Sequence, residues 1–340
     1  RIELLLDRVK QERPAALICI DYPGFNLRFA REVRKLGIPC LYYIVPQVWA
    51  WKPRRAGRMA EFIDRAFCVF EFEPPFFEKF RTPQRKMKTI FVGHPLLDQP
   101  KPPKLELPPG PKTVSFLPGS RDSEFNSHAG IFSQAFARVI DSGKQTVGLM
   151  SLAKGLSVAS VKRSFADFLF PQVKVVENID CRKFDRSDIL CGPWKIHLEY
   201  TQIIDASGVS NWPHAAVLPM VSDFSVVKSG TSTLEAGLQG NPLCVVYKGG
   251  WISYSIARLL VDIPCFSLVN IVLGRYAVPE LLQGEVNPRR IAAEIERGLT
   301  DQKYIEQQRA ALAELPKKLG GPGASQRAAQ GMLDFLRGRE

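Results

Sequence analysis

Short apolar runs alternate with amphipathic segments of helical period along most of this chain, and this alternation limits the folds that it can adopt. The run at 15–20, AALICI, lies between Pro14 and Asp21 and predicts a buried strand. The next segment, NLRFAREVRKLG (26–37), has apolar residues at helical spacing and ends at a glycine. Further predicted strands follow at 39–45, 66–70 and 89–93, with predicted helices near 54–63 and 73–80. Such strict alternation predicts an α/β fold with a parallel sheet covered by helices on both faces.

A proline-rich stretch divides the chain. Residues 98–112 contain six prolines, which neither a helix nor a central strand tolerates. A length of 340 residues also suits two domains better than one. We therefore predict a first domain at 1–98, a linker at 99–112, a second domain at 113–318 and a C-terminal helix at 319–340.

Alternation resumes in the second domain. Its predicted strands lie at 113–117, 146–150, 173–177, 224–228 and 241–247. One predicted helix ends near residue 142, another contains Glu235, and the region at 287–337 is helical with a break at 319–323. The segment at 180–220 fits no clear pattern and leaves a surface insertion open.

Charge and cysteine usage narrow the class of protein. The net charge of +12 favours anionic partners (nucleic acid, phosphorylated metabolites or an anionic membrane), although an ordinary basic surface gives the same total. The seven cysteines are scattered without CxxC or Cys/His ligand spacing, so we expect buried free thiols in a reducing cytoplasm and no metal site. No run of 18 apolar residues predicts a membrane span. The chain starts with Arg inside a helix-like segment, so we expect the native N-terminus to lie upstream.

One junction in the second domain places small polar residues directly after a predicted strand. In VVKSGTSTLEAG the strand ends at Lys228, and Ser229, Gly230 and Thr231 come before the next helix. The backbone N–H groups at such a helix start favour anions, above all phosphate. Glu235, one turn later, can accept hydrogen bonds from a ribose diol. The alternative is a plain helix cap by Ser229 or Thr231, with Glu235 offsetting the helix dipole.

An earlier junction, FLPGSRDSEF (116–125), has the same design. Gly119 and Ser120 offer backbone donors, and Arg121 carries a planar guanidinium group suited to phosphate. Two anion-binding junctions in one domain suggest a diphosphate, as in a nucleotide-sugar. The GxxxxGK[ST] and GxGxxG patterns are absent from the sequence, so it predicts neither a P-loop nor a dinucleotide-binding fingerprint.

The first domain offers a carboxylate and an aromatic, basic run. Asp21 comes directly after the strand at 15–20, where it can accept a proton from an attacking hydroxyl or form an Asx turn. The run at 45–58 suits nucleic-acid stacking or a membrane interface, with core packing of its aromatic rings as the alternative. Its candidate residues are Trp49, Trp51, Lys52, Arg54, Arg55 and Arg58.

Taken together, these motifs resemble the lipid-A-disaccharide synthase family of glycosyltransferases. The matching pieces are IDYPGFN, YYIVPQVWAWKPRR, FVGHPLLD, LPGSRDSE, KSGTSTLEA, SLVNIVLGR and VPELLQ, which cover most of residues 15–285. The resemblance implies a GT-B fold, in which two Rossmann-like doubly wound domains face each other across a cleft and UDP binds the C-terminal one. It implies transfer of diacylglucosamine from UDP-2,3-diacylglucosamine to the 6-hydroxyl of 2,3-diacylglucosamine 1-phosphate (lipid X). The products would be a β-1′,6-linked disaccharide 1-phosphate and UDP.

The resemblance also implies roles for individual residues. Asp21 matches an essential aspartate and would be the general base, and Arg121 matches an essential arginine and would contact the UDP diphosphate. The rest of the nucleotide site would comprise Gly119, Ser120, Ser229, Gly230, Thr231 and Glu235, with Asn270, Glu280 and Gln283 at polar positions that line the cleft. No metal or other cofactor is expected.

The same resemblance implies a subcellular localisation and a set of binding partners. It implies a peripheral protein on the cytoplasmic face of the inner membrane of a Gram-negative-type bacterium. The basic, aromatic run at 49–58 would meet the anionic bilayer from which acylated substrates are drawn, and nucleic acid would not be a partner. The sequence leaves a homodimer open.

The chain departs from the family pattern in two places. The family opens with a first strand and a Gly-Glu-x-Ser-Gly-Asp loop that are missing here, and the segment at 180–220 is longer than expected. Two alternatives therefore stay open. One is another GT-B enzyme, such as the lipid-II-forming N-acetylglucosaminyltransferase or a UDP-sugar epimerase. The other is a truncated chain that binds UDP or a membrane without turnover.

Overall fold

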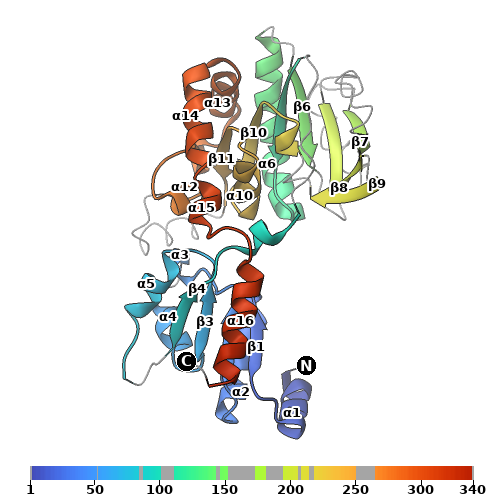
Figure 1. Ribbon diagram of the computed structural model, residues 1–340. Helices are drawn as coiled ribbons and strands as arrows, with labels where there is room; N and C mark the ends of the chain where they lie inside the picture. Colours follow the sequence, from blue (N-terminus) through green and yellow to red (C-terminus); the bar gives the residue numbers. More distant parts are fainter. Residues whose placement is uncertain are drawn as a thin grey trace. The chain divides into compact units, whose positions relative to one another are not determined.

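The chain forms two compact units (Figure 1). The computed structural model describes residues 2–51, 53–83, 87–100, 111–142, 146–151, 173–180, 194–205, 208–213, 218–249 and 265–338. Unit 1 holds the described residues up to Pro100 and those from Pro316 onward. Unit 2 holds the described residues between these two segments.

Unit 1 is built on a parallel sheet. Its described strands run in the order β1 (Leu17–Ile20), β2 (Cys40–Tyr43), β3 (Arg65–Cys68) and β4 (Lys88–Phe91). Its described helices are α1 (Ile2–Glu12), α2 (Pro23–Lys35), α3 (Val48–Trp51), α4 (Arg54–Met59), α5 (Glu73–Glu78) and α16 (Ala324–Leu336). Every residue of β2 and β3 is buried, as in the centre of a sheet covered on both faces. The predicted alternation is confirmed in this unit.

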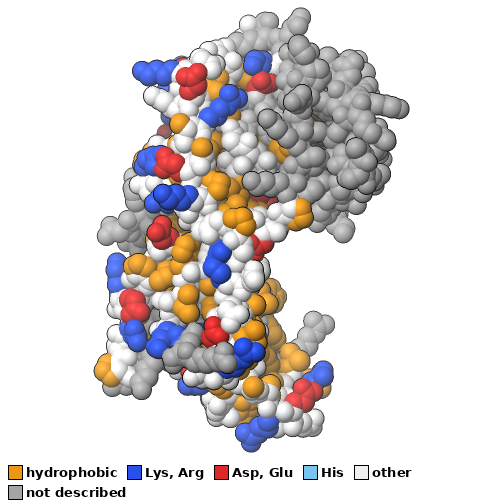
Figure 2. All heavy atoms as spheres, in the orientation of Figure 1, with side chains coloured by type: hydrophobic (Ala, Val, Ile, Leu, Met, Phe, Trp, Pro, Cys, Tyr) orange, Lys and Arg blue, Asp and Glu red, His pale blue; other side chains and the backbone are white. Residues whose placement is uncertain are grey.

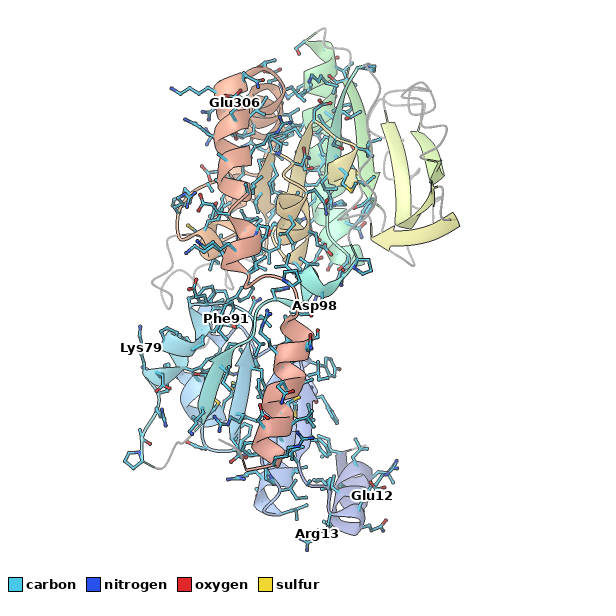
Figure 3. The ribbon with its side chains drawn as sticks, in the orientation of Figure 1. Glu12, Arg13, Lys79, Phe91, Asp98 and Glu306 are labelled. Carbon is cyan, nitrogen blue, oxygen red and sulfur yellow. The ribbon has the colours of Figure 1, made fainter. Side chains whose placement is uncertain are left out.

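The last helix of the chain belongs to unit 1. Asp98, at the end of a 3₁₀ turn that follows β4, accepts hydrogen bonds from the backbone N–H groups of Gly323, Ala324 and Ser325 at 2.6, 3.0 and 2.7 Å (Figure 3). This carboxylate caps the positive end of α16. Arg327 adds a 2.7 Å hydrogen bond to the carbonyl of Val92. These contacts fix α16 to the segment after β4.

Unit 2 is built on a larger, mainly parallel sheet. Its described strands have the order β12-β11-β10-β5-β6-β8-β7, and β9 pairs antiparallel with β8. They are β5 (Lys112–Leu117), β6 (Thr146–Ser151), β7 (Val173–Asp180), β8 (Trp194–Asp205), β9 (Gly208–Pro213), β10 (Phe224–Lys228), β11 (Leu243–Tyr247) and β12 (Glu280–Leu282). The predicted strands of the second domain correspond to β5, β6, β7, β10 and β11. Two strands, β8 and β9, lie in the segment at 180–220, where the sequence predicted none.

The described helices of unit 2 pack on this sheet. They are α6 (Asp122–Asp141), α10 (Thr231–Leu238), α12 (Leu268–Leu273), α13 (Pro288–Thr300) and α14 (Gln302–Leu312). The short helix α15 (Leu315–Lys318) starts at the last residue of unit 2, and its other residues belong to unit 1. α6 and α13 share one core with the central strands, in which Phe116, Phe132, Phe224 and Ile291 are fully buried. Asn287 caps α13 through a 3.0 Å hydrogen bond from the N–H of Arg290. The predicted C-terminal helical region is thus confirmed.

The surface of the described residues carries charges of both signs. On the face shown in Figure 2, Lys and Arg side chains are interspersed with Asp and Glu. Within the described ranges, none of the helices has the length and apolar character needed to cross a bilayer. Cys19, Cys40, Cys68, Cys244 and Cys265 are buried free thiols, as predicted, and the remaining two cysteines lie outside the described residues.

Candidate active site

β5 ends in a glycine turn that leads into α6. Gly119 has φ = +114°, where residues with a Cβ are strained, and an added Cβ would lie 2.8 Å from the Cβ of Glu124. Arg121 is the N-cap residue of α6, and its side chain is largely exposed. The turn therefore places Ser120 and Arg121 at the positive end of a 20-residue helix.

Glu124, in the first turn of α6, accepts hydrogen bonds from this loop and from the end of β10. Its carboxylate accepts hydrogen bonds from the N–H of Ser120 (3.2 Å), Nη1 of Arg121 (3.0 Å) and Nζ of Lys228 (2.7 Å). Burial raises the pKa of Glu124, but the hydrogen bond and charge of Lys228, together with Arg121, bring the pKa below its ordinary value. Glu124 and Lys228 were not among the site residues predicted from the sequence. In the sequence they are an acidic residue just after the first predicted loop and a lysine just before the second.

A cavity of about 880 Å³ opens between α6 and the ends of β10 and β11. Its lining includes Arg121, Glu124, Lys228, Tyr247 and Lys248. The volume falls within the range of small-ligand pockets, and three of these side chains are basic. All the lining residues belong to unit 2, so this unit alone forms a cavity suited to an anionic ligand.

The junction between β10 and α10 lies next to the β5 junction. β5 and β10 are parallel neighbours in register, with Leu117 opposite Val227. Among the described residues, no side chain caps α10, whose N-cap is Gly230. The structure therefore does not show the alternative, in which the side chain of Ser229 or Thr231 caps α10. Ser229 instead donates to the carbonyl of Phe266 at 3.4 Å.

Glu235 lies in α10 and is partly buried. Burial raises the pKa of its carboxyl group. Within the described part of the chain, no donor contacts this carboxylate, which leaves it available to a ligand hydroxyl. Its assignment to a ribose diol stays a prediction.

The prediction that Asn270 lines the nucleotide cleft is wrong. Asn270 is fully buried, and its Oδ1 accepts from the N–H groups of Ala277 (2.8 Å) and Val278 (3.0 Å). Its Nδ2 donates to the carbonyl of Val278 (2.8 Å) and to Oε1 of Glu280 (2.8 Å). An amide side chain has two donor hydrogens and two acceptor lone pairs, so nothing remains to contact a nucleotide. Asn270 holds the loop after α12 instead.

Glu280 and Gln283 flank β12. The carboxylate of Glu280 also accepts from the N–H groups of Phe266 (2.7 Å) and Ser267 (2.8 Å), so it fixes the turn that Ser229 contacts. Gln283 has φ = +51° directly after the strand, and its buried Nε2 has no hydrogen-bond partner among the described residues. Gln283 is thus the better placed of the two for a ligand contact.

Asp21 lies in unit 1, directly after β1. Its backbone is left-handed (φ = +44°), as is that of Tyr22. The Asp21 carbonyl accepts from Nδ2 of Asn26 (2.7 Å) and from the Tyr42 hydroxyl (2.7 Å), and its N–H donates to Tyr43 (2.9 Å). The carboxylate itself is exposed and makes no hydrogen bond within the described residues. A strained but well-held backbone with a free side chain favours a functional role over an Asx turn.

The prediction for Trp49 is also wrong. Trp49 was a candidate for membrane contact, but its ring is only 4% exposed and packs edge-on against Phe70 and Phe72. Its Nε1 donates to Glu73 at 3.0 Å, so the indole serves the core of unit 1. Arg54, Arg55 and Arg58 on α4 are exposed, whereas Lys52 and the side chain of Trp51 lie outside the described residues.

The structure groups most of the candidates in unit 2. The two junctions that follow β5 and β10 lie side by side, and the network of Ser229, Glu280 and Asn270 supports the second of them. Asp21 and the basic residues of α4 belong to unit 1. Among the described side chains, no group of three or more His, Cys, Asp or Glu residues is arranged to hold a metal ion.

Comparison with known proteins gives a consistent result. The family model for lipid-A-disaccharide synthetase matches residues 1–167 and 198–333. The chain is 37% identical to the lipid-A-disaccharide synthase of Anaeromyxobacter dehalogenans strain 2CP-1 over 334 residues, which is 96% of this chain and 77% of that protein. It is 32% identical to the lipid-A-disaccharide synthase of Geobacter sulfurreducens over 333 residues, 95% of this chain and 76% of that protein.

Solved structures with the same fold include a protein with UDP bound and a glycosyltransferase. S. aureus MnaA with UDP has a TM-score of 0.61 at 12% identity, covering 99% of this chain and 80% of that chain. The calicheamicin glycosyltransferase CalG4 has a TM-score of 0.53 at 14% identity, covering 99% and 77%. At such identities the likeness concerns the fold alone, and it confirms the predicted GT-B architecture of two Rossmann-like units.

Proposed function

The chain belongs to the lipid-A-disaccharide synthetase family, a family of glycosyltransferases of lipid A biosynthesis, and from this premise we propose its substrates and the roles of its residues. The donor is UDP-2,3-diacylglucosamine and the acceptor is 2,3-diacylglucosamine 1-phosphate. The 6-hydroxyl of the acceptor attacks C1 of the donor sugar, the bond from C1 to the UDP oxygen breaks, and the products are a β-1′,6-linked disaccharide 1-phosphate and UDP.

The observation that carries the proposal is the pair of neighbouring junctions after β5 and β10. Negative charge grows on the β-phosphate as UDP leaves, and the enzyme must stabilise it. The start of α6, the guanidinium of Arg121 and the N–H groups near Gly230 and Thr231 offer that stabilisation. We assign these groups to the diphosphate, with no metal ion taking part.

Two further contacts complete the proposed nucleotide site. The carboxylate of Glu235, which no donor among the described residues contacts, accepts hydrogen bonds from the ribose hydroxyls. Gln283 donates from its unpartnered Nε2 to a polar group of the donor. Asn270 and Glu280 do not contact the nucleotide in this proposal. Asn270 donates to Glu280, Glu280 holds the turn at Phe266, and the Phe266 carbonyl accepts from Ser229.

Asp21 is the proposed general base. It takes the proton of the 6-hydroxyl as that oxygen attacks C1, which raises the nucleophilicity of the oxygen at the transition state. The three hydrogen bonds to its backbone hold in place the main chain from which the carboxylate projects.

The acylated substrates require access to a membrane. We propose that the protein acts as a peripheral protein on the cytoplasmic face of the inner membrane, where exposed Arg54, Arg55 and Arg58 attract anionic lipid headgroups.

An assay with defined donors tests this function. Purified protein is incubated with 2,3-diacylglucosamine 1-phosphate and either UDP-2,3-diacylglucosamine or UDP-N-acetylglucosamine, with and without EDTA. We expect disaccharide 1-phosphate and UDP in equal amounts from the diacylated donor, at a rate that EDTA leaves unchanged. Transfer from UDP-N-acetylglucosamine alone, or its epimerisation, would favour another GT-B activity, and a loss of rate in EDTA would contradict the metal-free site.

A further inference from the structure

The carboxylate of Glu124 is the common acceptor for donors from both anion-binding junctions. Ser120 and Arg121 follow β5, Lys228 ends β10, and all three contact the two oxygens of Glu124 at 2.7–3.2 Å. The Lys228 contact joins residues 104 positions apart in the sequence. A single side chain therefore ties the two loops together.

These donors are also the ones that a phosphate group requires. Carboxylate and phosphate oxygens accept the same charge-assisted hydrogen bonds from backbone N–H, guanidinium and ammonium groups. A phosphate placed against Ser120 and Lys228 would also lie close to the negative charge of Glu124, which would repel it. The single N–H of Ser120 can serve only one of the two anions, whereas Lys228 and Arg121 have further N–H donors. Glu124 therefore competes directly for Ser120 and opposes a phosphate at the two cations through its charge.

We propose that Glu124 competes with the nucleotide's phosphates: its carboxylate must leave the N–H of Ser120 and move away from Arg121 and Lys228 before a phosphate binds tightly to these groups. This inference rests on the proposed function, and it adds Lys228 as a phosphate contact and Glu124 as a positioning residue. With Glu124 turned away, two cations and a helix start face the diphosphate. When Glu124 returns to its three donors, it competes with product UDP and favours its release.

The surroundings of Glu124 leave room for this movement. The side chain is partly exposed and lines the 880 Å³ cavity, so it can rotate without entering the core. The Glu124 side chain lies against Gly119, and a Cβ at this position would be 2.8 Å from the Glu124 Cβ, so the glycine allows Glu124 to occupy its bonded position.

A purely structural role for Glu124 predicts a different outcome on substitution. A glutamate in the first turn of a helix can simply bond back to the preceding loop. Glu124→Gln keeps the size of the side chain and one acceptor oxygen, so a structural role would be largely preserved. The charge that competes with phosphate would be lost. The substitution thus separates the two roles.

The test measures binding of UDP and of inorganic pyrophosphate by titration calorimetry at several salt concentrations. The variants are wild type, Glu124→Gln and the control Glu314→Gln, which neutralises a carboxylate paired with Arg275 at 2.6 Å outside the cavity lining. We expect Glu124→Gln to bind both ligands about tenfold more tightly, within the range for one charge pair at about 4 Å. Its affinity should fall more steeply with salt, and UDP should dissociate more slowly. Glu314→Gln should match the wild type.

Lys228→Met provides the second variant. It should weaken pyrophosphate binding, and most of the gain from Glu124→Gln should vanish in its background, because the freed cation is missing. Thermal melting verifies that each variant is folded. Equal or weaker binding of UDP by folded Glu124→Gln would overturn the inference while leaving the proposed function intact. If neither wild type nor Glu124→Gln bound UDP, both the nucleotide site and the inference would fail.

Discussion

Asp21 combines a rigid backbone with a free carboxylate, which is what a general base requires. Asparagine also tolerates the left-handed conformation, so Asp21→Asn should keep the local backbone. The carboxamide cannot accept the proton, and we expect kcat to fall by about 10²–10⁴-fold. The UDP dissociation constant should stay unchanged, as calorimetry would show. A matching loss of UDP affinity would remove Asp21 from the role of base, and so would full transfer activity.

Arg121 should act on the nucleotide itself. Charge-assisted hydrogen bonds contribute about 1.5–3 kcal/mol each, so Arg121→Ala should weaken UDP binding by about 10–100-fold. Arg138→Ala, an exposed arginine near the other end of α6, is the matched control. Equal UDP affinity in the two variants would exclude Arg121 from the diphosphate site.

The sequence could predict the local structure around candidate residues that lie within one loop. Gly119, Ser120 and Arg121 sit in a loop between a strand and a helix, and three or four neighbouring residues determine that geometry. Asn270 could not be judged in this way, because its polar atoms are saturated by residues seven to ten positions away that meet it only in the folded loop. Trp49 was misassigned because its contacts, Phe70, Phe72 and Glu73, come from a later segment of the chain that meets it only in the folded unit.

At the scale of elements, the length of a helix decided whether the sequence could predict it. Helices of several turns, such as α2, α6 and α13, show a full hydrophobic period and were predicted. The one-turn helix α3 (Val48–Trp51) is too short to show a period, and it is the helix that turns Trp49 inward. Strands β8 and β9 fall in a segment with no clear alternation of apolar and polar residues, so neither strand was predicted.

The start of α5 holds a carboxylate that should make unit 1 sensitive to pH. Burial raises the pKa of Glu73 from 4.5 to about 7, against hydrogen bonds from Trp49, Phe70 and Val69 that lower it. The folded state therefore holds the proton more tightly than the unfolded state. This contribution to stability is complete below pH 4.5 and is lost as pH rises through 7.

Hydrogen exchange of the β3 amides measures this effect. We expect their opening free energy to fall by on the order of 3 kcal/mol between pH 4.5 and 8 in the wild type. Glu73→Gln, which cannot ionise, should be destabilised at low pH but lack this slope. The same slope in both proteins would show that Glu73 does not titrate in this range.

At the scale of the whole molecule, the proposed membrane contact depends on α4 of unit 1. Near an anionic surface each arginine contributes about 1 kcal/mol, so replacing Arg54, Arg55 and Arg58 by Gln should weaken binding to phosphatidylglycerol vesicles by about 100-fold at low salt. The control replaces the exposed arginines of α13 and α14, namely Arg289, Arg290 and Arg309. An equal loss in the two triple variants would mean that net charge, and not the α4 surface, drives binding.

The account as a whole depends on unit 2 holding a nucleotide diphosphate between the β5 and β10 junctions. A crystal structure of the protein with UDP tests this most directly. We predict phosphate oxygens within hydrogen-bond distance of the Arg121 guanidinium and of the N–H groups at the start of α10. A diphosphate bound away from both junctions would contradict the account.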